Sequence, residues 1–175
     1  HVFGKELFGD SLEGVIRATG VEKRRVCDNK NKRVTVMDLS IKAAEKLYQN
    51  QKLDKKDFGA ILFVTSSPDS IMPNNATHVQ HLMGFGNDLA AFDINHACAA
   101  YPYGLWVSSM IANSTQKKVL LLEGDTNSYF VSPEDKSTAL LFGDAGTATI
   151  VAPTDENCEF VFGFDTDGSM RDSLY

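Results

Sequence analysis

The chain has 175 residues, of which 43% are hydrophobic and 23% are charged, and its formal net charge is −6. This composition is typical of a globular protein with one domain core, in which about 70% of the unfolded surface is buried. A negative net charge disfavours nucleic acid as the main partner, because phosphate binding needs a basic surface. The three cysteines, Cys27, Cys98 and Cys158, are widely spaced and form no CxxC pair, which favours neither a disulfide framework nor a metal site.

Helical patterns recur along the chain and end at glycines or polar residues. They predict helices at 11–18 before Thr19-Gly20, at 39–51 with Ser40 as the N-cap, at 75–83 before Gly84, and at 98–113. Residues 94–116 contain no charged side chain, but Asn95, His96 and Pro102 interrupt the apolar run, so we interpret it as a helix buried within protein rather than in lipid.

Continuous apolar runs separate the helical patterns. They predict buried strands at 59–65, 89–94 and 118–123, a hairpin formed by 139–142 and 147–151 around Gly143-Asp144, and a last strand at 158–164. The polar stretches between them are expected to be loops. Strands that alternate with helices predict a single α/β domain with mainly parallel strands and right-handed crossovers.

No signal peptide opens the chain, and we expect a cytoplasmic protein without a membrane span. Because His1 is not an initiator methionine, we also expect the chain to begin inside a longer gene product.

Cys98 lies between a predicted strand and a predicted helix, with small residues on both sides at Ala97, Ala99 and Ala100. A nucleophile on a tight strand-to-helix turn needs small neighbours, and Pro102 is typical of a helix start. A thiol at a helix N-terminus has a stabilised thiolate, and free backbone N–H groups there can bind an oxyanion. This position indicates acyl-thioester chemistry; a buried structural cysteine is the alternative.

Several segments in the right order resemble ketoacyl-acyl-carrier-protein synthase III enzymes. Residues 19–25 (TGVEKRR) are similar to their TGI-x-x-R-R segment, and 65–69 (TSSPD) with Pro73 to the loop after their first long strand. Residues 92–98 (FDINHAC) are similar to their active-site turn, 132–135 (SPED) to D-P-x-D, and 141–145 (LFGDA) to the start of L-F-G-D-G-A. The resemblance runs from about Leu12 to Tyr175.

The resemblance implies a thiolase-like fold of two duplicated halves, with residues 1–175 as the N-terminal half: a βαβαβ-type unit with a mainly parallel sheet and a buried nucleophile helix. It implies that Cys98 takes an acyl group from a thioester, before a decarboxylative Claisen condensation with malonyl-acyl carrier protein in fatty-acid or related metabolite synthesis. The His and Asn that the family uses in that second step lie beyond Tyr175. Implied partners are acyl carrier protein or coenzyme A thioesters and a second copy in a homodimer, with no cofactor. Met72 matches a bulky residue that lines the partner's acyl pocket across the dimer interface; an exposed loop methionine is the alternative.

Three departures concern coenzyme A. Where the family often has a tryptophan and an arginine that grip the adenine, this chain has Gly14 and Ala18, and Lys136 replaces a further arginine. Loss of a stacking ring and of a guanidinium fork weakens nucleotide binding, so we expect an acyl carrier protein to prime the enzyme. The family's G-D-G-A is G-D-A-G here, which still allows close backbone packing.

Other residues carry a functional and a structural interpretation. His96 either polarises the thiol or is structural, and His78 with His81 form either an incomplete metal site or a solvated face. Asp144 either holds a tight turn near the active site or belongs to a plain hairpin turn. Two larger groups remain open in the same way: aromatic residues as an acyl tunnel or as core (Tyr101, Tyr103, Trp106), and basic residues as a carrier-docking patch or as a solvated loop (Lys23, Arg24, Arg25, Lys30, Lys32, Arg33).

Two rival functions remain open. One is a sister enzyme of the same fold, such as a hydroxymethylglutaryl-CoA synthase or an ester-forming acyltransferase, which would place different groups around the cysteine. The other is a non-catalytic partner subunit of a condensing enzyme; such subunits commonly lack the cysteine, so Cys98 argues against it. The chain on its own is expected to be inactive.

Overall fold

The computed structural model describes residues 2–27, 33–156 and 159–173. A single four-stranded sheet runs through the described residues in the order β2-β1-β3-β4. β1 (Phe58–Val64) pairs in parallel with both β2 (Ala90–Ile94) and β3 (Lys118–Thr126), whereas β4 (Asp144–Val151) pairs antiparallel with β3. The predicted α/β class with a mainly parallel sheet is therefore confirmed.

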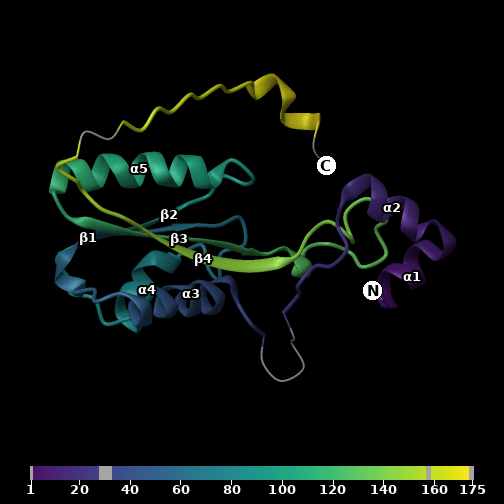
Figure 1. The fold of residues 1–175 in the computed structure, drawn as a ribbon, viewed down its shortest axis with the longest axis horizontal. Coiled ribbons are helices and arrows are strands. Elements are labelled where there is room, and N and C mark those ends of the chain that lie inside the picture. The colour runs from purple at the N-terminus through teal and green to yellow at the C-terminus, as the bar shows by residue number, and fades with distance from the viewer. Residues whose placement is uncertain (1, 28–32, 157–158, 174–175) are drawn as a thin grey trace.

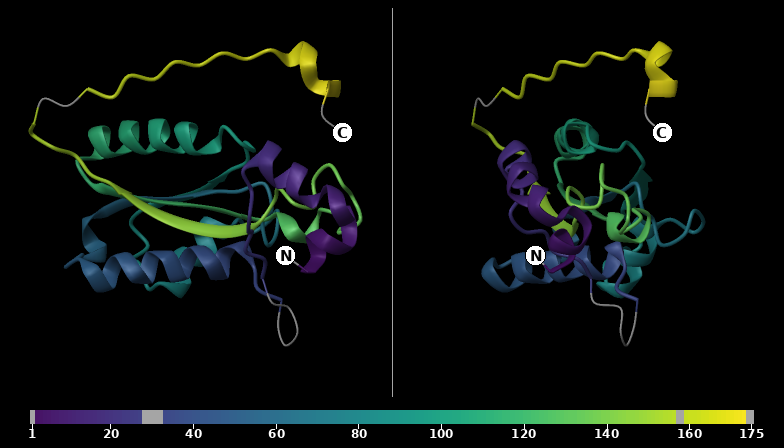
Figure 2. Two further views of the ribbon diagram at one scale, coloured as in Figure 1. Left: turned by 45° about the vertical axis from the view of Figure 1, so that its right-hand side comes forward. Right: turned by 90° about the vertical axis from the view of Figure 1, so that its right-hand side faces the viewer.

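Helices cover both faces of this sheet (Figure 1). α3 (Val36–Asn50) and α4 (Asn75–Leu82) lie on one face, and α5 (Ala100–Thr115) lies on the other. α1 (Val2–Phe8) and α2 (Leu12–Thr19) form a separate pair beyond one end of the sheet (Figure 2). The carboxyl ends of β1, β2 and β3 meet at one edge, because parallel strands run in the same direction.

Side chains that alternate along the strands form two hydrophobic cores, one on each face of the sheet. On the α3 and α4 side, Phe58, Phe63 and Leu122 pack with residues of both helices. On the α5 side, Leu62 and Leu121 pack against small residues of the single helix. β1 contributes to both cores, which explains its uninterrupted apolar sequence.

Two helix ends confirm their sequence signals, and one start does not. α2 ends at Gly20, which has a left-handed φ of 70°, and α4 is followed by Gly84 with a φ of 67°. The prediction that Ser40 caps α3 is wrong. Thr35 is the N-cap and forms a capping box with Asp38, so the helix begins at Val36, and Ser40 is buried within it.

α5, the helix expected to be buried within protein, is buried in this chain along one stripe. Its buried residues repeat every four positions and are small: Ala100, Gly104, Ser108 and Ala112. A Cβ at Gly104 would lie 2.9 Å from Leu121 Cδ1, so glycine lets the helix approach the sheet closely. The aromatic residues of α5 lie outside the core. Tyr101 is exposed, while Tyr103 and Trp106 contact Phe164 of the C-terminal segment.

Three expectations about strands are corrected. β2 is a half-buried edge strand rather than a buried one. Residues 139–142 form turns, and β4 begins at Asp144 and pairs with β3, so the predicted hairpin does not exist. No strand forms within 159–164, and Cys158 lies outside the described residues. Within the described ranges, no helix has the length and apolarity needed to cross a membrane.

Candidate active site

Cys98 lies in the turn that joins β2 to α5, and its side chain is exposed. The turn is tight: Ala97 has a positive φ of 22°, and the Ala100 N–H donates to the Ala97 carbonyl at 3.0 Å. α5 begins at Ala100, two residues later than predicted, so Cys98 precedes the helix instead of forming its first residue. The thiol therefore lies at the carboxyl edge of the sheet, next to a helix N-terminus and open to solvent.

His96 lies in the same turn as Cys98. Its ring packs edge-on against Tyr103, with 4.3 Å between the ring centroids. The side chain is exposed, and none of the hydrogen bonds described for the turn joins it to the thiol. The ring contact with Tyr103 favours the structural interpretation of His96.

Asp125, near the end of β3, organises the chain segment that leaves β1. One carboxylate oxygen accepts hydrogen bonds from Thr65 Oγ1 at 3.0 Å, the Ser66 N–H at 2.8 Å and Ser67 Oγ at 2.9 Å. Ser67 Oγ in turn accepts a bond from the Thr126 N–H at 2.9 Å. Asp125 was not predicted from the sequence, because the residues that donate to it lie in a distant segment of the chain.

Asp93, on β2, anchors the other end of the same connection. Its two carboxylate oxygens accept the Asn75 and Ala76 backbone N–H groups, each at 2.8 Å, so they bind the N-terminus of α4. Burial raises the pKa of Asp93 above its usual value, although these two hydrogen bonds oppose the rise. Asp93 precedes Cys98 by five positions, so the anchor lies on β2 and the proposed nucleophile lies in the turn that follows this strand.

Met72 lies between these two anchors, in the segment from β1 to α4. Its side chain is 85% exposed, and that of Ile71 is 88% exposed. The Met72–Pro73 peptide bond is cis. Neither side chain belongs to the core of this chain.

Asp144 joins three segments on the other side of the carboxyl edge. Its oxygens accept the Cys27 N–H at 2.7 Å, the Ser128 N–H at 2.9 Å and Ser128 Oγ at 2.6 Å. Burial, the largest single influence, would raise the pKa of Asp144, but these hydrogen bonds outweigh it and hold the pKa below its usual value. Asp144 is thus a structural junction and not the plain hairpin turn of the alternative.

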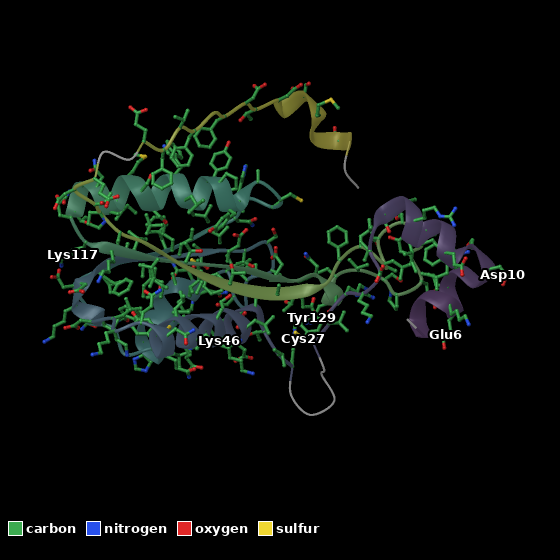
Figure 3. The ribbon with its side chains drawn as sticks, viewed as in Figure 1. Glu6, Asp10, Cys27, Lys46, Lys117 and Tyr129 are labelled. Carbon is green, nitrogen blue, oxygen red and sulfur yellow. The ribbon has the colours of Figure 1, made fainter. Side chains whose placement is uncertain are left out.

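The second described thiol lies beside this junction. Figure 3 shows Cys27 next to Tyr129, and the two residues line a cavity of 240 Å³ together with Ser128 and Pro133. Burial, followed by the negative charge of Asp144, raises the pKa of the Cys27 thiol above its usual value. A half-buried thiol of this kind is a poor nucleophile at neutral pH.

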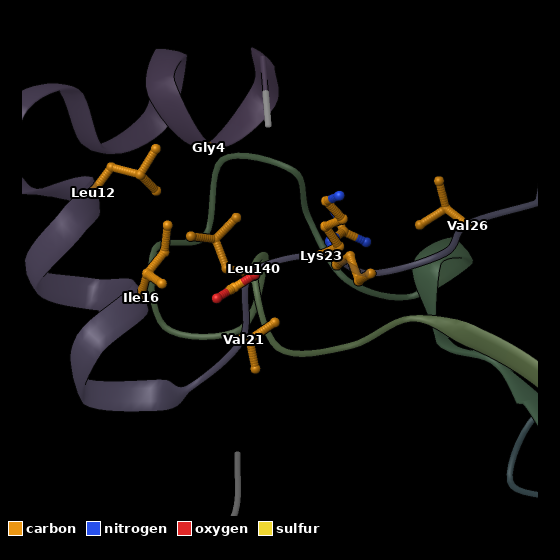
Figure 4. A pocket seen from close by; sticks show the side chains of 9 residues that line it. Gly4, Leu12, Ile16, Val21, Lys23, Val26 and Leu140 are labelled. Atoms are coloured by element: carbon orange, nitrogen blue, oxygen red, sulfur yellow. The ribbon is translucent and has the colours of Figure 1, made fainter.

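Two of the three departures that concern coenzyme A lie on α2, and the third, Lys136, lies close to α1. Gly14 and Ala18 are exposed on α2, and a Cβ at Gly14 would have no atom within 4 Å. Lys136 Nζ lies 5.9 Å from the centre of the Phe8 ring of α1. Leu12 and Ile16 of α2 line a cavity of 370 Å³, together with Leu140 from a distant segment (Figure 4).

The histidine pair and the basic residues singled out in the sequence do not form a site together in the described part of the chain. His78 and His81 are exposed, and the described residues contain no group of three or more side chains that could hold a metal ion. Two residues of the predicted basic cluster make contacts with other parts of the chain. Arg24 donates to the Phe142 carbonyl at 2.9 Å, and the Arg33 guanidinium lies over the Tyr129 ring. Lys30 and Lys32 lie outside the described residues.

Sequence comparisons place these features among known proteins. Residues 92–168 match the family model of 3-Oxoacyl-[acyl-carrier-protein (ACP)] synthase III. A Campylobacter jejuni protein is 37% identical over 164 residues, which are 94% of this chain and 45% of that protein. A Beta-ketoacyl-[acyl-carrier-protein] synthase III of Clostridium perfringens is 33% identical over 172 residues, which are 97% of this chain and 52% of that protein. The chain spans about half the length of the curated relatives it matches.

A structural comparison agrees with the sequence comparisons. A 3-oxoacyl-(acyl-carrier-protein) synthase III crystal structure superposes with a TM-score of 0.87 at 32% identity, covering 95% of this chain and 50% of that one. The likeness confirms the predicted thiolase-like fold. The matched region of the family model contains both Asp93 and Cys98.

Proposed function

The chain belongs to the 3-oxoacyl-[acyl-carrier-protein] synthase III family, and from this premise we propose that it works as the N-terminal half of a condensing enzyme with Cys98 as its nucleophile. The observation that carries the proposal is the exposed thiol of Cys98 in the tight turn before α5, at the carboxyl edge of the sheet. Ligand sites of open α/β sheets lie at this edge. The rival functions considered above are not favoured by these relatives.

The proposed reaction has two steps. The Cys98 sulfur attacks the carbonyl carbon of an acyl thioester, and the thiol of the donor leaves, so that the acyl group is now held as a thioester on Cys98. The Cys98 N–H, in the turn that precedes α5, is the proposed donor to the oxyanion in that step. Decarboxylation of malonyl-acyl carrier protein then supplies a carbanion that attacks the acyl group and releases Cys98. The His and Asn for this second step would come from the other half of the enzyme.

Intact mass spectrometry of the complete enzyme tests the first step. After incubation with an acyl thioester, the mass of the wild type should rise by one acyl group, and peptide mapping should locate it on Cys98. The Cys98→Ala variant should gain no mass, whereas Cys27→Ala should behave like the wild type. Acyl transfer to any residue other than Cys98 contradicts the proposal.

We further propose that an acyl carrier protein, rather than free coenzyme A, supplies the first acyl group. The supporting observation is the bare surface of α2, where Gly14 and Ala18 offer neither a ring nor a guanidinium to an adenine. Acetyl-carrier protein should load Cys98 at least about tenfold faster than acetyl-CoA, a difference of about 1.4 kcal/mol in barrier. The paired variant Gly14→Trp with Ala18→Arg should narrow this difference by accelerating only the acetyl-CoA reaction. Equal loading by both donors in the wild type contradicts this proposal.

Met72 is proposed to line the acyl pocket of a second copy in a homodimer. Its exposure, and that of Ile71 beside it, support a role outside its own chain. Met72→Ala should shift the preference of the complete enzyme toward longer acyl groups by enlarging the pocket. An unchanged preference would leave Met72 as an ordinary loop methionine.

A further inference from the structure

The connection from β1 to α4, residues 65–74, is anchored at both ends by carboxylates from neighbouring strands. At the first end, Asp125 of β3 accepts three hydrogen bonds, from Thr65 Oγ1, the Ser66 N–H and Ser67 Oγ, at 2.8–3.0 Å. At the second end, Asp93 of β2 accepts two backbone N–H groups of α4, each at 2.8 Å. Hydrogen bonds to a carboxylate are stronger than neutral ones, so both ends are firmly held.

Burial changes sharply along this connection. Thr65 and Ser67 are 4% and 5% exposed, and Asn75 at the far end is 1% exposed. Between them the chain leaves the core, and Ile71 and Met72 are 88% and 85% exposed. In the right-hand view of Figure 2 the connection, in the blue-teal of these residues, projects from the body of the molecule. The connection therefore has an exposed apolar tip, Ile71 and Met72, between two buried ends.

The two anchors belong to the strands that flank β1 in the sheet. β2 pairs with β1 on one side and carries Asp93, and β3 pairs with it on the other side and carries Asp125. β2 also leads directly into the turn that holds Cys98. The tip of the connection and the thiol are thus held relative to one another through the sheet, although they belong to different segments.

We infer that Asp125 and Asp93 are positioning residues that set the acyl-chain selectivity of the enzyme. They fix the two ends of the connection, and so the position at which Ile71 and Met72 are presented at the carboxyl edge. The inference rests on the proposed function, in which Met72 lines an acyl pocket. Neither carboxylate contacts the reacting atoms: the oxygens of Asp125 and Asp93 bind the connection itself.

The test uses the complete enzyme and measures Cys98 acylation by intact mass spectrometry with two-, four- and eight-carbon acyl thioesters. Asp125→Asn keeps the size of the side chain but replaces a carboxylate that accepts three bonds by an amide that accepts them poorly. The ratio of short-chain to long-chain rates should change by about fivefold or more, a size typical of one altered pocket contact. Alkylation of Cys98 by iodoacetamide should stay within about twofold of the wild type, because the thiol's own turn is unaltered.

Two further variants make the outcome decisive. Ser67→Ala removes only one hydroxyl from the Asp125 cluster and should shift the ratio in the same direction by about twofold. It replaces Asp125→Asn as the deciding variant if the latter does not fold. Asp88→Asn is the matched control, because Asp88 is exposed at the opposite edge of the sheet, where it forms a 4.0 Å ion pair with Lys117. Its ratio should equal that of the wild type.

Selectivity that is unchanged in both Asp125→Asn and Ser67→Ala overturns the inference, while acylation of the wild type leaves the proposed function standing. If the wild type itself is not acylated on Cys98, the proposed function fails instead. Hydrogen exchange then still tests the anchor. The backbone amides of Ser66 and Ser67, which are hydrogen-bonded to Asp125 and to Thr65 Oγ1, should exchange about tenfold faster in Asp125→Asn than in the wild type. Exchange at the wild-type rate would show that Asp125 does not hold the connection.

Discussion

The two described thiols of this chain lie in regions of opposite character. Cys98 is exposed in the tight turn between the end of β2 and the start of α5. Cys27 is half-buried, and its own backbone N–H donates to Asp144, which also binds Ser128. The first region leaves its cysteine free for chemistry, whereas the second uses the surroundings of its cysteine to join segments that are far apart in the sequence.

The difference lies in the surroundings of the two cysteines: one thiol is exposed, and the other is half-buried beside a carboxylate. Near Cys27, burial and the Asp144 charge both act against the thiolate and raise the pKa. Near Cys98, the small residues Ala97, Ala99 and Ala100 leave the sulfur accessible, and the helix N-terminus lies beside it. The contrast is open to experiment at both cysteines and at the carboxylates near them.

The largest expected effect separates the two cysteines by activity. Cys98→Ala should lower condensation by the complete enzyme by about a thousandfold or more, because the acyl group then has no covalent acceptor. Cys27→Ala should change the rate by less than about twofold, since this thiol is half-buried beside Asp144. Steady-state turnover with saturating donor measures both. Comparable losses in the two variants would break the contrast between the regions.

The next effect concerns alkylation. At pH 7.5 iodoacetamide should modify Cys98 at least about tenfold faster than Cys27, measured by peptide mapping over a time course. The rate at Cys27 should still rise about tenfold per pH unit as the pH approaches 9, because its raised pKa keeps it mainly protonated there. A plateau in the Cys27 rate below pH 8 would mean that Asp144 and burial do not act on this thiol as described.

Asp144→Asn should change the Cys27 region in two measurable ways. Removal of the negative charge should lower the pKa of Cys27 and speed its alkylation by about threefold to tenfold, while Cys98 is unaffected. The free energy of unfolding at pH 7 should fall by about 1–3 kcal/mol, because the donors at Cys27 and Ser128 lose a charged acceptor.

The sign of the pH dependence provides the control for Asp144→Asn. The pKa of Asp144 is lowered in the fold, so its contribution to stability is present above its unfolded value of 3.8 and is lost as the pH falls through the folded value. The wild type and the variant should therefore converge in stability in acid. A difference that persists unchanged at low pH would assign the loss to packing and not to the carboxylate.

Local signals in the sequence predicted much of this arrangement. β1 was visible as an apolar run, α2 and α4 by the glycines that follow them, and the Cys98 turn by its alanines and Pro102. These features depend on a few neighbouring residues, and backbone sterics act on them directly. The family resemblance likewise depended on short ordered segments, and the matched region 92–168 lies within it.

Features that depend on contacts between distant segments could not be predicted in the same way. Asp125 was missed because its donors Thr65, Ser66 and Ser67 lie about sixty positions away, and nothing in the local sequence around Asp125 identifies them. The hairpin at 139–151 was wrong for a related reason. β4 pairs with β3 rather than with the adjacent residues 139–142, and Asp144 is held by residues that include Cys27. The start of α3 was placed too late because the N-cap is Thr35, in a capping box with Asp38, and not the predicted Ser40.

Substitution of Glu123 gives the smallest expected effect. Its pKa is raised rather than lowered, so its contribution to stability changes with pH in the opposite direction to that of Asp144. Glu123 lies on the same face of β3 as Leu121, whereas Gly124 faces the α3 side, so Glu123 is on the α5 side of the sheet and pairs with Thr147 of β4. Burial, followed by the negative charge of Asp125, raises the pKa of Glu123 above its usual value of 4.5. A raised pKa means that the folded state holds this proton more tightly, so stability is lost as the pH rises from 4.5 through the folded value.

Glu123→Gln should therefore raise the free energy of unfolding at pH 7 by about 0.5 kcal/mol, a size usual for a half-exposed position, and should have no effect at pH 4 or below. Urea unfolding of the two proteins at pH 4 and pH 7 measures the difference. Glu156→Gln, an exposed glutamate beyond β4, is the matched control and should change neither value. Destabilisation of Glu123→Gln at pH 7 would mean that the carboxylate has a favourable partner in the folded enzyme. In that case hydrogen-bond donors would stabilise the charged form of Glu123, as they do for Asp144. The contrast between these two carboxylates would then not hold.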